Sequence, residues 1–187
     1  MGRKQFVSLA FGRQIAFYLL LIFTKAIIAV ADESSEYVLP YAQNSKYKLL
    51  QGYNGPWGHE GHCAFAYDFQ MPVGTPVHAA RSGKVVHIEK QFKDATRKPG
   101  EENVIVVMHE DGTYGRYYHL TQNGVNVSVG DAVKQNQLIG ASGDSGASAG
   151  PHLHFDVTKD CFEWGCQTIK IIFQNTKDNP LKAGEKY

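Results

Sequence analysis

GPHLHFDV, residues 150–157, is the segment that indicates the fold class most directly. Polar and apolar residues alternate from His152 onward, which is typical of a β-strand with one face in a core. Residues two apart on a strand point to the same side, so His152 and His154 project together, about 7 Å apart at ~3.3 Å per residue. Leu153 and Phe155 face the opposite side and are expected to pack in the core.

The rest of the chain continues as short strands separated by turn signals. Apolar-rich runs span residues 84–90 and 103–109, and Asp111-Gly112 then predicts a hairpin to a strand over residues 114–120. Residues 138–141 are another strand candidate, residues 125–133 carry a Gly130-Asp131 turn, and residues 93–102 are expected to form a charged surface loop. Since no amphipathic helix pattern follows residue 31, we predict an all-β domain, mainly antiparallel sheets with short helices at most.

The N-terminus has a different composition. Basic residues precede an apolar run that Lys25 interrupts and that ends in Ala29-Val30-Ala31. This pattern is typical of a secretory signal peptide cut after Ala31, and the run is too short and broken for the ~20 apolar residues of a membrane anchor, the alternative interpretation. We therefore expect export to the periplasm or the medium, with a signal peptide over 1–31, a polar lead-in over 32–50, a catalytic domain over 51–160 and a C-terminal extension over 161–187.

The charge of the chain excludes one class of partner. Without residues 1–31 the chain has 15 basic and 18 acidic residues, a net charge of −3. Such a chain has no electrostatic footprint for nucleic acid.

The three cysteines are expected to play different roles. Cys161 and Cys166 flank a short segment with Gly165, which eases a tight turn, so we predict a local disulfide between them in an oxidising compartment. Cys63 is left over and is expected to be a buried, small apolar residue. The alternative for Cys63 is a redox-sensitive thiol beside the functional site.

Asp68 lies among apolar residues and needs a cation. Burying a carboxylate alone is costly, and a metal ion beside it would remove that cost. His59, nine residues earlier, is a plausible partner, because two neutral imidazoles and one carboxylate match a catalytic zinc shell with a fourth position for water. His119, at the end of a predicted strand, is expected to reach the same site. The remaining histidines outside this region are expected to be structural or exposed: His78, His87 and His109.

Sequence blocks around these residues form a recognisable series in order and spacing. The series consists of Gly58-His59-Glu60-Gly61, residues 66–72, Gly74-Thr75-Pro76-Val77, Ala79-Ala80 with Gly83, Tyr117-Tyr118-His119-Leu120, Gly130-Asp131 with Val133, Ile139-Gly140, and residues 150–155. Over residues 51–158 the chain thereby resembles the lysostaphin/LytM-type zinc metallopeptidases.

The resemblance implies a site and an architecture. It implies antiparallel sheets with a groove across one of them, and one zinc ion per chain bound by His59, Asp68 and His154. His119 and His152 would be catalytic histidines that do not bind the metal. In many family members the first ligand and the aspartate are only four residues apart. The longer spacing found in a branch of the family favours His59, nine residues from Asp68, and His62 remains the alternative.

The resemblance also implies an activity. Members of the family hydrolyse peptide cross-links or bridges in peptidoglycan with a metal-activated water. One of the two catalytic histidines would be the general base and the other would stabilise the oxyanion. Tyr53, upstream of His59, is a further candidate donor to the transition state, because family members often place a tyrosine there.

Three alternatives remain for the function. Gly143-Asp144-Ser145-Gly146 resembles the nucleophile segment of a serine protease, but the other blocks have no place in that fold, and residues 142–150 are better interpreted as a flexible turn. The chain is alternatively a catalytically silent, peptidoglycan-binding activator of another hydrolase, although every ligand is present. The third alternative is a broad secreted metalloprotease.

Overall fold

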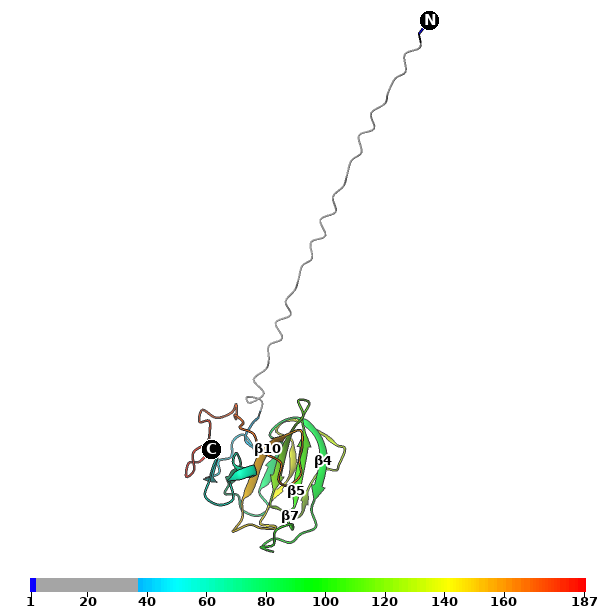
Figure 1. Ribbon diagram of the computed structural model, residues 1–187. Coiled ribbons are helices and arrows are strands. Elements are labelled where there is room, and N and C mark those ends of the chain that lie inside the picture. Colours follow the sequence, from blue (N-terminus) through cyan, green and yellow to red (C-terminus); the bar gives the residue numbers. More distant parts are fainter. Residues whose placement is uncertain (3–36) are drawn as a thin grey trace. The chain divides into compact units, whose positions relative to one another are not determined.

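The protein is described by a computed structural model of residues 1–2 and 37–187, so most of the expected signal peptide lies outside the described residues. Residues 37–187 form β-strands and a single turn of 3-10 helix at Gly61–Cys63 (Figure 1). No helix in these residues is long and apolar enough to span a membrane. The strands are β1 (Leu49–Gln51), β2 (Tyr67–Phe69), β3 (Pro76–His78), β4 (Gly83–Glu89), β5 (Val104–Met108), β6 (Thr113–Tyr118), β7 (Leu120–Val125), β8 (Ala132–Val133), β9 (Leu138–Ser142) and β10 (Leu153–Lys159).

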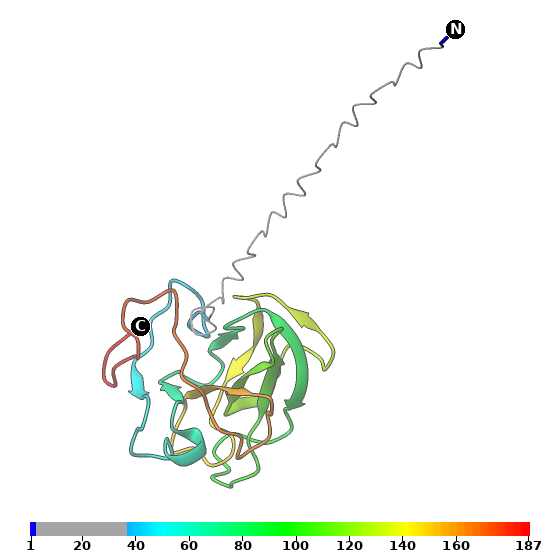
Figure 2. The same cartoon turned by 45° about the horizontal axis from the view of Figure 1, so that its top comes forward.

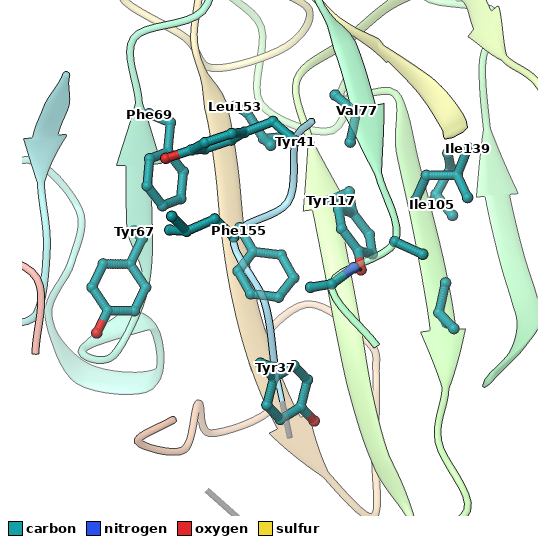
Figure 3. Packing of buried hydrophobic residues seen from close by; sticks show 14 of the residues in the cluster. Tyr37, Tyr41, Tyr67, Phe69, Val77, Ile105, Tyr117, Ile139, Leu153 and Phe155 are labelled. Atoms are coloured by element: carbon teal, nitrogen blue, oxygen red, sulfur yellow. Dashed lines mark hydrogen bonds between the residues drawn. The ribbon is translucent and has the colours of Figure 1, made fainter. Parts of the chain in front are cut away.

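The strands form two antiparallel sheets, which confirms the predicted all-β class. The larger sheet has the order β1-β2-β10-β6-β5-β4-β8 and the smaller has the order β3-β9-β7. The hydrophobic core includes Val77 and Ile139 from the smaller sheet and Ile105, Tyr117 and Phe155 from the larger one (Figure 3). One face of the larger sheet is thus buried in the core, and its other face is left for the site.

Strand β10 shows the predicted alternation. Leu153 and Phe155 are fully buried in the core, where Figure 3 shows Phe155 between Tyr67 and Tyr117. His152 and His154 line a groove instead. The two-residue period of the strand therefore puts the packing residues on one face and the two histidines on the other.

One predicted strand was wrong in its extent. The run expected over residues 114–120 is divided at His119, whose φ of 62° places it in the left-handed region. Strand β6 ends at Tyr118 in the larger sheet, and β7 begins at Leu120 and pairs with β9 in the smaller sheet. A positive φ carries the chain from one sheet to the other, and an apolar pattern does not reveal such a change in backbone angle.

The segments before residue 50 and after residue 160 are part of the same core. Tyr37, Tyr41 and Leu49 precede the expected domain, and Phe173 and Tyr187 follow it, yet all are buried in one cluster. Figure 2 shows the end of the chain, in red, returning beside β1, where Leu49 and Glu185 share a backbone hydrogen bond. The boundaries expected at residues 50 and 160 separate no compact units within residues 37–187.

The buried side chain of His109 gives the fold a dependence on pH. Its Nδ1 donates to the Ser82 carbonyl at 2.8 Å, and its buried Nε2 has no hydrogen-bond partner. Burial lowers the pKa of His109 from 6.5 to about 4. The unfolded chain therefore binds a proton that the folded chain does not, and stability falls as the pH drops from 6.5 towards 4.

We expect His109→Gln to remove this contribution. The free energy of unfolding of the wild type should fall between pH 7.5 and pH 5 by about 2 kcal/mol more than that of the variant, from the linkage of the two pKa values. Denaturant unfolding at the two pH values measures the difference. An equal pH dependence in both proteins would show that His109 does not carry it.

Candidate metal centre

Three neighbouring segments bring the predicted ligands together. Antiparallel pairing of β2 and β10 places Asp68 directly opposite His154. His59 comes from the loop between β1 and the 3-10 helix and is 2% exposed. The three side chains are buried and offer ligand atoms that all lie within 4.8 Å of one another.

The ligand atoms converge on one oxygen of the aspartate. Asp68 Oδ1 lies 3.1 Å from His59 Nε2 and 2.9 Å from His154 Nδ1. His59 Nε2 is buried and makes no hydrogen bond, despite that short distance. A buried nitrogen left without a partner beside a carboxylate is what a cation between them would satisfy.

The other nitrogen of each imidazole is already bound. His59 Nδ1 donates to the Gly52 carbonyl at 2.9 Å, and His154 Nε2 lies 3.1 Å from Asp156 Oδ2. With its proton on Nδ1, His59 presents the lone pair of Nε2 to Asp68. Two imidazoles and one carboxylate with such partners fit a divalent metal ion of the zinc type.

Gln51 orients the aspartate. Its Nε2 donates to Asp68 Oδ2 and to the Trp57 carbonyl, both at 2.7 Å. Its Oε1 accepts from the Trp57 amide at 3.1 Å. Because Oδ2 is taken by Gln51, Oδ1 is the oxygen left for the histidines.

The charges of the centre depend on each other. Burial by itself would raise the pKa of Asp68, but the neighbouring imidazole of His154 holds it well below its usual value. Burial by itself would lower the pKa of His154, but Asp156 and Asp68 on its two sides raise it to about 9. Without a metal ion this ring therefore holds a proton between two carboxylates, and binding a cation at Nδ1 would release that proton.

His119 and His152 form a pair beside this centre. Their ring centroids are 4.6 Å apart, and His152 Nε2 lies 3.8 Å from Asp68 Oδ2. His119 Nδ1 contacts the Ser145 carbonyl and His152 Nδ1 the Gly150 carbonyl, each at 2.8 Å. In both rings Nδ1 is thus hydrogen-bonded to the backbone, and Nε2 remains available. Burial, together with His152 and His154, lowers the pKa of His119 to about 3, which keeps that ring neutral.

The turn before β10 is held in place by hydrogen bonds, in contrast to the flexible turn expected. Asp144 is buried and accepts from Arg97 at 2.7 Å and from Ser148 at 2.6 Å, and its amide donates to Asp94. Ser145 Oγ donates to the Leu120 carbonyl at 2.8 Å. A fully buried hydroxyl in that role is no nucleophile, so the serine-protease resemblance has no structural basis.

Of the two residues near the first ligand, His62 lies apart from the centre, whereas Cys63 lines the same groove as the ligands. His62 packs against Trp164, with ring centroids 5.1 Å apart, and is not among the side chains gathered around Asp68. Cys63 is 2% exposed, as expected for a buried apolar residue, and burial raises the pKa of its thiol to about 11. The structure therefore brings His59, and not His62, to Asp68 and His154.

Tyr53 is placed away from the site. Its hydroxyl donates to the Ile171 carbonyl at 3.0 Å and accepts from the Ile171 amide at 2.8 Å. It does not line the groove. The suggested role of Tyr53 as a donor to the transition state is thus not supported, because the C-terminal segment already uses its hydroxyl.

Three residues around the centre were not predicted from the sequence: Gln51, Arg116 and Asp156. Asp156 follows His152 and His154 at the same two-residue spacing, so strand alternation alone puts it on the histidine face of β10. Arg116 and Gln51 carry no such signal, since their contacts depend on which strands become neighbours.

A groove of about 1300 Å³ runs over the centre. The five polar residues of the centre, His59, Asp68, His119, His152 and His154, lie along it with aromatic and small side chains around them. Trp57 and Trp164 are 74% and 68% exposed, so the groove has two aromatic residues that reach solvent. The Cys161–Cys166 disulfide closes the loop that carries Phe162 and Trp164.

The chain is similar in sequence to lysostaphin and to two named endopeptidases. The chain is 41% identical over 113 residues to lysostaphin from Staphylococcus staphylolyticus, a match that covers 59% of this chain and 22% of lysostaphin. It is 39% identical over 120 residues to the glycyl-glycine endopeptidase ALE-1 from Staphylococcus capitis, covering 63% of this chain and 31% of that protein. The peptidoglycan DD-endopeptidase ShyA from Vibrio cholerae is 37% identical over 90 residues, 48% of this chain and 19% of ShyA. The chain thus spans about a fifth to a third of the length of these relatives.

Solved structures show the same fold. The catalytic domain of lysostaphin from Staphylococcus simulans superimposes with a TM-score of 0.51 at 37% identity, covering 65% of this chain and 88% of that domain. A zinc-containing peptidase from Vibrio cholerae gives a TM-score of 0.54 at 25% identity, covering 78% of this chain and 41% of that one.

The model of peptidase family M23 matches residues 63–165. The matched segment is more than half of the chain and includes Asp68, His119, His152 and His154, while His59 lies just before it. With the fold and the geometry of the centre, this match leads to one conclusion: the chain belongs to peptidase family M23.

Proposed function

We propose that the protein is a zinc-dependent endopeptidase that hydrolyses peptide bonds of peptidoglycan, with His59, Asp68 and His154 as the metal ligands. The observation that carries the proposal is the convergence of His59 Nε2 and His154 Nδ1 on Asp68 Oδ1. These atoms lie along a groove of about 1300 Å³. One zinc ion held there would polarise the attacking water and the scissile carbonyl.

His119 and His152 supply the remaining acid–base chemistry in this proposal. A ring whose Nδ1 proton is bound to a backbone carbonyl keeps the lone pair of Nε2 for a proton. One of the two accepts the proton of the attacking water at Nε2. The other, once its Nε2 carries a proton, donates to the carbonyl oxygen and stabilises the charge that develops there. Their fixed contacts hold both rings in this orientation before substrate binds.

The substrate class rests on the relatives. Lysostaphin-like proteins include a glycyl-glycine endopeptidase and peptidoglycan DD-endopeptidases, all of which are longer proteins than this chain. Export belongs to the same proposal, since peptidoglycan lies outside the cytoplasm. The Cys161–Cys166 disulfide supports it, because such bonds persist in oxidising compartments.

The first ligand can be tested by metal binding. We expect His59→Ala to bind no stoichiometric zinc, because the centre loses one of its three ligand atoms. The matched control His62→Ala should keep one zinc per chain, because His62 packs against Trp164. Metal analysis after dialysis against trace zinc measures both, and the opposite pattern would move the first ligand to His62.

The histidine pair can be tested by turnover. We expect His119→Ala and His152→Ala to retain zinc and to lose at least about 100-fold in kcat, the usual contribution of a general base. The control His78→Gln changes a histidine that contacts the Asn136 carbonyl on the smaller sheet and should keep normal kcat. Near-normal turnover in either alanine variant would refute its catalytic role.

The bond cleaved can be identified directly. Peptidoglycan of several chemotypes and casein should be incubated with the protein, with and without chelator, and the fragments identified by mass. We expect chelator-sensitive release of peptide fragments from peptidoglycan only. Equal cleavage of casein would favour a broad metalloprotease, and zinc-free protein that only activates a partner amidase would favour a non-catalytic role.

A further inference from the structure

A fully buried ion pair lies directly behind the metal ligand His154. Asp156 on β10 and Arg116 on β6 are opposite each other in the sheet, and both side chains are 0% exposed. Arg116 Nε donates to Asp156 Oδ1 at 2.6 Å, and Nη2 donates to Oδ2 at 2.8 Å. Neither residue touches the catalytic pair, and the chemistry proposed above uses neither of them.

The hydrogen bond between Asp156 and His154 decides which nitrogen of His154 faces the metal site. Its Oδ2 lies 3.1 Å from His154 Nε2, while His154 Nδ1 lies 2.9 Å from Asp68 Oδ1. A carboxylate without a proton only accepts hydrogen bonds, so it requires a proton on Nε2. The proton that stays with the ring during metal binding is then on Nε2, and Nδ1 is the ligand atom.

Arg116 holds both carboxylate oxygens of Asp156 in the position that the hydrogen bond to His154 requires. Oδ1 is occupied by Nε of the arginine, and Oδ2 accepts from both Nη2 and His154. The third branch of the guanidinium, Nη1, donates to the carbonyls of Phe162 and Glu163 at 3.3 and 2.8 Å. The arginine therefore connects the disulfide-closed loop of the groove to the residue behind the metal ligand.

We infer that Asp156 is a positioning residue, which, held by Arg116, makes His154 present Nδ1 to the metal ion. The inference rests on the proposed function and adds a role for two residues outside the ligand set. A purely structural role for the pair is the competing explanation, since breaking a buried ion pair destabilises a protein wherever it lies. Stability and zinc affinity must therefore be measured separately.

Asp156→Asn is the first test. The amide carries no charge and its NH₂ cannot accept, so the acceptor that faces His154 Nε2 is either a weaker, neutral oxygen or is replaced by a donor. We expect zinc to bind about 10–100-fold more weakly, as is typical when the partner of a ligating histidine is lost. Competition with a chromophoric chelator measures the affinity, and denaturant unfolding of the metal-free protein measures stability.

A double variant separates positioning from packing. Arg116→Met with Asp156→Leu removes both buried charges and fills the space, an exchange that often leaves stability unchanged or improved. We expect an unfolding midpoint of the metal-free double variant near that of the wild type, with zinc affinity as weak as in Asp156→Asn. Wild-type zinc affinity in the double variant would overturn the inference.

The matched control is another ion pair in the same fold. Asp111 pairs with Arg81 away from the groove, with both side chains largely buried. We expect Asp111→Asn to lower the unfolding midpoint and to leave zinc affinity unchanged. Weaker zinc binding in this control would mean that loss of stability alone explains the effect.

One measurement needs no substitution. Long-range ¹H–¹⁵N spectra of the zinc-loaded wild type should show the His154 ring with its proton on Nε2. A proton on Nδ1 would overturn the inference. If the wild type binds no zinc and cleaves no peptide, the proposed function fails; if it does both and Asp156→Asn binds zinc like the wild type, only this inference fails.

Discussion

The antiparallel register of β2, β10 and β6 is the constraint on which the rest of the structure depends. It places Asp68 on one side of His154 and Tyr118 on the other, with Arg116 opposite Asp156. A shift of one residue would turn the histidines into the core and Leu153 and Phe155 into the groove. Because Phe155 is fully buried among aromatic residues, the packing of the core opposes that shift.

Charges in the centre are tolerated because each one has partners. Asp68 is bound by Gln51 and flanked by two imidazoles, and Asp156 is bound by Arg116. The unpartnered atom is His59 Nε2, and it faces the oxygen on which the other ligand nitrogen converges. Burial strengthens each of these contacts, and it also raises the free-energy cost of a polar atom that has no partner.

The groove and the metal centre are built from different parts of the chain. The predicted ligands Asp68 and His154 lie on paired strands, whereas His59, the 143–150 turn and the 161–166 loop belong to connections between strands. Hydrogen bonds from Arg97 and Ser148 to Asp144 and from the Asp144 amide to Asp94 fix the turn. Arg116 and the disulfide hold the loop. Loops that are held in this way by a rigid sheet can keep the shape of a peptide-binding surface even when no peptide is bound.

From the sequence alone it was predictable that residues 153–157 form a strand, that His152 and His154 lie on one face of it, and that Asp68 would favour a cation beside it. These properties are local, since they follow from a two-residue period and from the cost of burying one charge. The family blocks added His59 and His119 through their order and spacing.

Only the tertiary structure decided which side chains meet across strands and loops. In the structure the predicted strand is divided at His119, and the Tyr53 hydroxyl is hydrogen-bonded to Ile171. Side chains from residues 37–50 and 161–187 are part of the core. It also paired Gln51 with Asp68 and Arg116 with Asp156. These contacts join residues that are distant along the chain, and they depend on register and backbone angles that no local pattern specifies.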